Sequence, residues 1–251
     1  MRPYNIYSLV SESRPLIIAK YGNSSRFPEN TYISLESAMD NYADVIQIAL
    51  QMSSDGHLVV FNDLYLENKS NGHGLVHSQS LDYLKNLDIG SWFSKEFKNQ
   101  RILTFPELLK LINSNIILSI EIKPNQKPGI EASIESTLIQ FNCINNHEIF
   151  SSEYTYLEKL SQRNKNIVLG YHFDNEETQQ SLNFMNTINS NLVHVNFNDV
   201  TDTLIRYFHS EGKILIVDSN SRTQLDQKLI QLGVDGIATN DPYDLYKMIN
   251  K

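Results

Sequence analysis

The sequence has little cysteine and no long apolar run. Cys143 is the one cysteine among 251 residues, so the chain cannot form an intramolecular disulfide, and no Cys/His grouping at zinc-ligand spacing surrounds it. We expect Cys143 to be a small buried apolar residue. No stretch approaches the roughly 18 consecutive apolar residues that a membrane span needs. Met1 is followed by polar residues instead of a signal peptide's apolar segment, so we expect a cytoplasmic protein without a membrane span.

Positive charge is also scarce. The chain has 21 Lys and Arg residues against 29 Asp and Glu residues, which gives a formal net charge of −8. Proteins that bind the phosphates of nucleic acids usually carry clustered Lys and Arg residues. No such cluster occurs in the sequence, and we therefore expect no nucleic-acid partner.

Most of the sequence consists of short apolar runs that alternate with helical patterns. Strand-like runs rich in Ile, Val and Leu occupy residues 16–19, 45–50, 58–61, 116–122, 149–150, 167–169, 192–195, 214–217 and 236–238. Apolar residues spaced by three or four indicate helices at 30–42, 105–111, 130–141, 154–162, 201–209 and 224–232. No Pro-, Gly- or Ser-rich linker interrupts this order. We therefore predict a single α/β domain over residues 1–251, a (β/α)8 TIM barrel.

Two features depart from a simple barrel pattern. Nine strand-like runs for eight barrel strands mean that one run is accessory, although the pattern does not say which. The segment at about residues 64–101 follows the third run and contains Asn71-Gly72, Gly74 and the aromatic pair Trp92-Phe93. Turn residues without regular periodicity indicate a small insertion after the third strand. We expect it to cap the barrel mouth, with the aromatic pair anchoring it.

The polar residues that close the predicted strands are the first candidates for a site. In TIM barrels the chemistry lies at the C-terminal face, where strands end and loops begin. These strand-end residues include Lys20 and Tyr21, Gln47 and Ala49, Asn62 and Asp63, Glu121 and Lys123, His194 and Asn196, and Asp218.

Several of these positions fall in segments that together resemble one family. The segments, in chain order, are Ala19–Gly22 followed by Pro28–Thr31, Gln47–Ala49, Ser54–Gly56, Phe61–Asp63, Gly90–Phe93, Glu121–Pro124 and Gly233–Pro242. Their order and spacing resemble those of the glycerophosphodiester phosphodiesterase family over nearly all of residues 16–245. The resemblance implies a TIM barrel and a phosphoric diester hydrolase of lipid metabolism.

The residues at the family's catalytic positions differ from those that the reaction uses. The resemblance implies two histidines acting as general acid and base, and the matching positions hold Lys20 and Asn62. An asparagine amide has no titratable proton near neutral pH, and a lysine would need a strongly lowered pKa to act as a base. We therefore expect no catalytic residue at these positions.

The expected metal site is altered as well. The resemblance implies a divalent cation held by three carboxylates, and the matching positions hold Gln47, Ala49 and Glu121. Mg²⁺ and Ca²⁺ require several oxygen ligands with enough negative charge to offset their own. We expect no metal and no other cofactor, and Mg²⁺ or Ca²⁺ only if the chain is an active enzyme.

The remaining groups could bind an anionic small molecule. Lys20 and Lys123 with Glu121 would give the site one net positive charge (two minus one). The candidate ligand-binding residues are Lys20, Tyr21, Glu29, Asn30, Glu121, Lys123 and His194. Simpler explanations exist for most of them. Asn30 or Thr31 would cap a helix, and Glu121 with Lys123 would form a buried salt bridge, with Lys20 as a further partner.

Three functions remain open. The first is a pseudoenzyme that keeps the family barrel and binds a phosphorylated or other anionic small molecule without metal. The second is an active hydrolase of glycerophosphodiesters that uses displaced groups such as Tyr21, Asp63 or His194. The third is a non-catalytic module that binds an unknown protein partner. We expect the chain to be inactive in the family reaction, because its site would lack the acid, the base and the metal.

Overall fold

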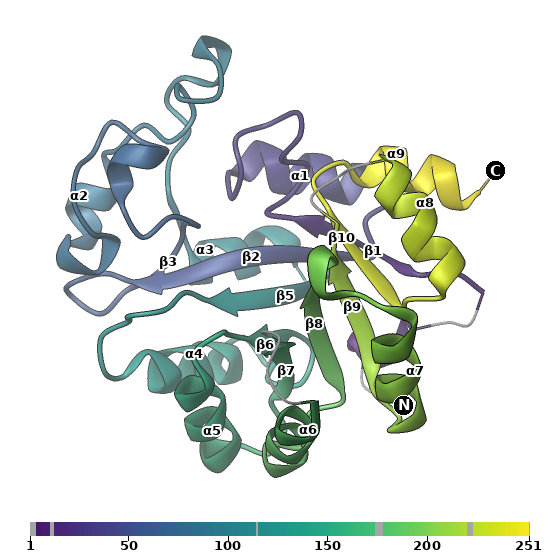
Figure 1. The fold of residues 1–251 in the computed structure, drawn as a ribbon. Coiled ribbons are helices and arrows are strands. Elements are labelled where there is room, and N and C mark those ends of the chain that lie inside the picture. Colours follow the sequence, from purple (N-terminus) through teal and green to yellow (C-terminus); the bar gives the residue numbers. More distant parts are fainter. Residues whose placement is uncertain (1–3, 11–12, 114, 174–177, 220–222, 251) are drawn as a thin grey trace.

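The chain folds into a closed barrel of parallel strands surrounded by helices (Figure 1). The computed structural model describes residues 4–10, 13–113, 115–173, 178–219 and 223–250. The eight strands of the ring are β1 (Leu16–Lys20), β2 (Val45–Met52), β5 (Ile117–Ile122), β6 (Glu148–Phe150), β7 (Val168–Phe173), β8 (Leu192–Asn196), β9 (Ile214–Asp218) and β10 (Gly236–Thr239). Pairing of β1 with both β2 and β10 closes the ring. The predicted TIM barrel is confirmed.

Helices connect the strands and cover the outside of the ring. The α-helices are α1 (Tyr32–Asp40), α2 (Leu81–Lys85), α3 (Phe105–Ile112), α4 (Ile130–Gln140), α5 (Tyr154–Arg163), α6 (Thr178–Thr187), α7 (Asp202–Ser210), α8 (Thr223–Leu232) and α9 (Pro242–Ile249). Sequence signals fix several of their starts. Thr104 caps α3 in a capping box with Glu107, and Thr31 caps α1 by accepting from the Ser34 amide.

Two short strands lie outside the ring, beside the C-terminal half of β2. β3 (Leu58–Val60) pairs antiparallel with β2, and β4 (Leu103–Thr104) pairs antiparallel with β3. The third strand-like run of the sequence is therefore the accessory one. The segment between β3 and β4 carries α2 and projects from one side of the barrel, at the left of Figure 1.

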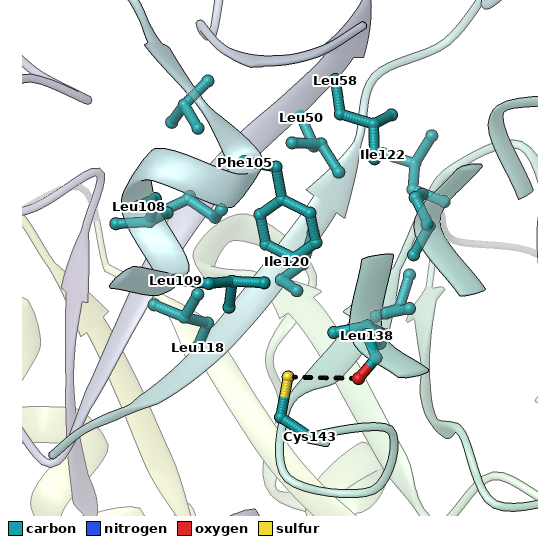
Figure 2. Packing of buried hydrophobic residues seen from close by; sticks show 14 of the residues in the cluster. Leu50, Leu58, Phe105, Leu108, Leu109, Leu118, Ile120, Ile122, Leu138 and Cys143 are labelled. Carbon is teal, nitrogen blue, oxygen red and sulfur yellow. Dashed lines mark hydrogen bonds between the residues drawn. The ribbon is translucent and has the colours of Figure 1, made fainter. Parts of the chain in front are cut away.

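The largest part of the core lies between the barrel strands and helices α3, α4 and α5. Phe105 and Leu109 of α3 contact a layer that includes Leu118 and Ile120 of β5 (Figure 2). Cys143 lies at the edge of this cluster, 4% exposed, with its Sγ 3.6 Å from the Leu138 carbonyl oxygen. Burial raises the pKa of this thiol to about 11, which keeps it protonated and unreactive at neutral pH. The expected apolar role of Cys143 is confirmed.

A second apolar cluster fills the lower interior of the barrel. Its side chains come from seven ring strands and from the N-terminal turn at Ile6–Ser8, where Ile6 is fully buried. This cluster fills the barrel interior toward the N-terminal ends of the strands. Among the described residues, no helix is both long and apolar enough to cross a bilayer.

Candidate functional site

A pocket of about 200 Å³ lies at the C-terminal ends of the ring strands. Its lining residues are Lys20, Tyr21, Gln47, Glu121, Phe150, His172, His194, Val195, Asn196, Asp218 and Ala238. This volume is below the range typical of drug-sized ligands, which begins at roughly 300 Å³. A larger hollow of about 610 Å³ lies outside the ring between β3, β4 and α4, away from the strand ends. The smaller pocket is therefore the candidate site.

The tight turn after β1 directs Tyr21 into this pocket. Tyr21 has a φ of +57°, and its amide and carbonyl are fixed by hydrogen bonds to the Gln47 carbonyl and the Asn30 amide, both 2.9 Å. Gly22 follows with a φ of +88°, and a Cβ there would lie 2.7 Å from the backbone of Ser34. Only glycine fits between this turn and α1. The turn thus holds a strained tyrosine in place at the mouth.

Glu121 is bound by two neighbouring side chains. Its Oε1 accepts from Lys123 Nζ at 2.8 Å, and its Oε2 accepts from the Tyr21 hydroxyl at 2.7 Å. Burial tends to raise the pKa of Glu121, but Lys123 and Tyr21 outweigh it, so the pKa is lowered and the carboxylate is ionised at neutral pH. Burial and Glu121 together raise the pKa of Tyr21, which stays a hydroxyl donor. The predicted salt bridge between Glu121 and Lys123 is present.

Lys20 forms its ion pair with Asp218 at the end of β9, which is separated from β1 in the ring by β10. The Lys20 ammonium also lies 5.7 Å from the centre of the Tyr21 ring. Including Asp218 changes the charge sum at the mouth, because two lysines now face two carboxylates. The net positive charge expected from Lys20, Lys123 and Glu121 alone is therefore wrong. The pocket is close to neutral and strongly dipolar.

A third pair of polar groups lies one layer deeper. His194 Nε2 is 2.6 Å from Glu148 Oε1, and the other oxygen of Glu148 accepts from Ser119 Oγ at 2.7 Å. Glu148 is fully buried and His194 is 6% exposed. The Phe150 ring stacks on the imidazole with centroids 3.9 Å apart and an interplanar angle of 8°. His194 therefore has a fixed orientation in the pocket wall.

The other predicted ligand-binding residues lie at the edge of the site. Glu29 is paired with Lys69 of the segment between β3 and β4, at 2.8 Å. Asn30 is buried and its Oδ1 accepts from the Ala49 amide at 3.3 Å, while its Nδ2 has no hydrogen-bond partner. Neither residue lines the pocket, and Thr31 is the helix cap. Asn62 is also absent from the lining.

The residues at the expected metal position do not fit a divalent cation. Gln47 supplies a neutral amide and Ala49 supplies no side-chain ligand. Both oxygens of Glu121, the remaining carboxylate, are taken up by Lys123 and Tyr21. Within the part of the chain that the structure describes, no group of three or more His, Cys, Asp and Glu side chains could hold a metal ion. The orphaned Nδ2 of Asn30 lies beside Ala49, where an aspartate would offer it an acceptor.

Several residues of the site were not among the candidate ligand-binding residues. Asp218 and Asn196 were candidates as strand ends, but nothing in the pattern showed that Asp218 would pair with Lys20. Glu148 was missed because the sixth strand was predicted to begin one residue later, at Ile149. The alternation of Glu148 and Phe150 on one face of β6 was the signal that could have found it. His172, in β7, also lines the pocket and was not among the candidates.

Comparison with known proteins agrees with this architecture. A model of the Glycerophosphoryl diester phosphodiesterase family matches residues 21–244. A glycerophosphodiester phosphodiesterase of Caldanaerobacter subterraneus is 29% identical over 95% of this chain and 99% of its own. A putative glycerophosphodiester phosphodiesterase of Bacillus subtilis is 30% identical over 90% of this chain and 94% of its own.

A solved structure shows the same fold over the whole chain. The phosphodiesterase of Oleispira antarctica, determined in complex with the product sn-glycerol-3-phosphate, superposes with a TM-score of 0.89 at 24% identity, covering 98% of this chain and 99% of that one. The motif order, the barrel and the extent of the match lead to one conclusion: this chain belongs to the glycerophosphoryl diester phosphodiesterase family.

Proposed function

We propose that this chain is a non-hydrolysing member of its family, a pseudoenzyme that binds a small phosphorylated molecule at the barrel mouth without a metal ion. The observation that carries the proposal is the occupation of both Glu121 oxygens by the Lys123 ammonium and the Tyr21 hydroxyl. An ammonium bonded directly to a carboxylate offsets its charge, as a cation ligated there would. The site therefore has its own counter-charge and does not need a dication for stability.

The acid and base of the family reaction have no evident replacement at their own positions. Lys20 is engaged by Asp218, and the amide of Asn62 cannot transfer a proton at neutral pH. Loss of each proton-transfer role commonly costs about 10²- to 10⁴-fold in rate. A phosphodiester bound in this pocket would lack an activated nucleophile and a protonated leaving group.

A phosphorylated ligand is supported by the chemistry and size of the pocket. Lys20 contributes an ammonium beside the side-chain amide of Gln47. The cavity volume of about 200 Å³ suits a head group such as glycerol phosphate and excludes a whole phospholipid. The Oleispira relative was determined with sn-glycerol-3-phosphate, which makes that compound the appropriate probe.

Two measurements on the purified chain test this proposal. The first follows release of glycerol phosphate from glycerophosphocholine and glycerophosphoethanolamine, with and without Mg²⁺, Ca²⁺ or Mn²⁺. The second measures sn-glycerol-3-phosphate binding by titration calorimetry in the presence of a chelator, with Lys20→Gln as the matched variant. We expect no turnover above background and metal-free binding that Lys20→Gln weakens. Metal-dependent turnover that disappears in Glu121→Ala would overturn the proposal.

One observation favours a second function, hydrolysis by displaced groups. An imidazole that is oriented by a carboxylate and lines a pocket, as His194 is by Glu148, is a common arrangement for a general base. Turnover that is independent of metal and lost in His194→Gln would support this alternative. Absence of turnover in the unmodified chain excludes it.

A further inference from the structure

The deepest polar layer of the pocket contains a carboxylate that lacks any route to solvent. Glu148 is fully buried, with one oxygen on Ser119 and the other on His194. Burial together with the charge of Glu148 raises the pKa of Tyr7, in the N-terminal turn, to about 12, so Tyr7 adds no charge. His194 is the one ion-pair partner of Glu148 among the described residues.

The two ring nitrogens of His194 have different surroundings. Nε2 lies 2.6 Å from an oxygen of the buried Glu148 carboxylate, a group that is costly in the interior of a protein without a compensating charge. An imidazole that carries a hydrogen on both nitrogens can donate to Glu148 through Nε2 and to a second anion through Nδ1.

The same geometry turns this nitrogen toward the pocket. Nε2 is committed to Glu148, whereas Nδ1 has no hydrogen-bond partner among the described residues. Nδ1 is not one of the fully buried polar atoms without a partner, and His194 lines the pocket. Stacking on Phe150 prevents the ring from turning away. The pocket wall therefore presents a ring nitrogen in a fixed position that can donate to an anionic ligand.

We propose that His194, held by Glu148, is a ligand-binding residue whose Nδ1–H donates to a phosphate oxygen of the molecule bound at the mouth. This inference rests on the proposed binding of a phosphorylated ligand and names the group that recognises it. Lys20 supplies a second donor from β1, on the opposite part of the ring. Two preorganised donors can hold an anion in a pocket whose fixed charges otherwise cancel.

Two substitutions at one position separate the two nitrogens of the imidazole. His194→Gln places an amide near Nε2, which preserves a partner for Glu148 and removes the donor at Nδ1. His194→Asn places its amide near Nδ1, which preserves the donor to the pocket. Dissociation constants for inorganic phosphate and sn-glycerol-3-phosphate would be measured by calorimetry in chelator, after circular dichroism has shown that each variant is folded.

We expect His194→Gln to weaken binding by about 10- to 100-fold, the range for loss of one hydrogen bond to a charged group. His194→Asn should bind within a few-fold of the unmodified chain. Equal binding by the unmodified chain and His194→Gln would overturn the inference while leaving the proposed function intact. Absence of binding by the unmodified chain would overturn the proposed function itself, and the inference with it.

A measurement on the unmodified chain guards against a variant that does not fold. Imidazole nitrogen NMR in the presence of saturating inorganic phosphate reports directly which nitrogens of His194 carry hydrogen, with His194→Gln identifying the signals by their absence. We expect a hydrogen on Nδ1 in the phosphate complex. An Nδ1 without hydrogen in that complex would overturn the inference whatever the calorimetry shows.

Discussion

Replacing Gly170 by alanine should lower the free energy of unfolding by an amount that follows from the packing around this residue in the barrel interior. Gly170 lies in β7, and a Cβ there would lie 2.1 Å from Glu148 Oε1 and 3.2 Å from His194 Nε2. Contacts that short do not occur, so the carboxylate would have to leave the imidazole. The absence of a side chain at residue 170 is what makes room for the buried pair.

The magnitude follows from three opposing contributions. Overpacking a well-filled interior typically costs about 1–3 kcal/mol. Loss of a hydrogen bond between charged groups costs about 1.5–3 kcal/mol. The lower entropy of an unfolded chain with alanine returns about 0.4–1 kcal/mol. Gly170→Ala should therefore lower the free energy of unfolding by about 2–5 kcal/mol.

Gly236 provides the matched control, because it is also a strand residue facing the barrel interior. A Cβ at residue 236 would lie 3.2 Å from the flexible side chains of Ile18 and Ile216. Gly236→Ala should change stability by less than about 1 kcal/mol. Urea denaturation followed by circular dichroism measures both variants, and the slopes should agree with that of the unmodified chain.

A double variant isolates the cause. Glu148→Ala removes the atoms that the new methyl group would strike, so Gly170→Ala in that background should cost at least about 1 kcal/mol less than it does alone. If Gly170→Ala proves as mild as Gly236→Ala, the carboxylate of Glu148 has room to move. That result would refute the claim that His194 is held in a fixed orientation.

Two further predictions concern the pH dependence of stability and the expected metal position. Burial lowers the pKa of His147 from 6.5 to about 4, so between these pH values the unfolded chain binds a proton that the folded chain does not. The free energy of unfolding should therefore be highest above about pH 6.5 and fall by about 3 kcal/mol toward pH 4. His147→Asn keeps an acceptor for the Leu118 amide and should flatten this part of a plot of urea midpoint against pH; an unchanged plot would contradict the assignment to His147. The double variant Gln47→Glu with Ala49→Asp should be stabilised against heat by Mg²⁺ or Ca²⁺, and the unmodified chain should not. The stabilisation should reach about 2.7 kcal/mol when the free metal concentration is 100 times the dissociation constant. Equal responses of the two proteins would show that these positions do not form the metal site.

The sequence predicted the ring strands well, because each is a short apolar run buried on both faces. It missed β4, whose two residues Leu103 and Thr104 are too few to form a pattern. It also missed α9, although Asp241 before Pro242 is a helix-start signal. α6 was missed for a different reason, since its sequence is largely polar and its apolar contribution to the core comes from Leu182 and Met185.

The positions of the candidate site residues could be predicted from the sequence, but their interaction partners could not. Lys20, Glu121 and His194 were correctly placed at the pocket, because strand ends of a barrel converge on one face. The pairing of Lys20 with Asp218 joins residues at opposite ends of the sequence. Such a pairing depends on how the ring closes and on side-chain reach. Neither the ring closure nor the side-chain reach can be derived from local sequence, and the expected net charge of the site was wrong for that reason.

The closure of the barrel by β1 and β10 has a consequence for how the chain must fold. Leu16 pairs with Gly236, and the N-terminal turn at Ile6 packs on residues of β8, β9 and β10. During synthesis the ribosome releases β1 long before its second neighbour exists, so one edge of β1 stays unpaired until the last strand emerges. Contacts of such large sequence separation slow folding and expose sheet edges to other chains. Protection of nascent β1 is therefore a requirement of this architecture, independent of whatever the finished pocket binds.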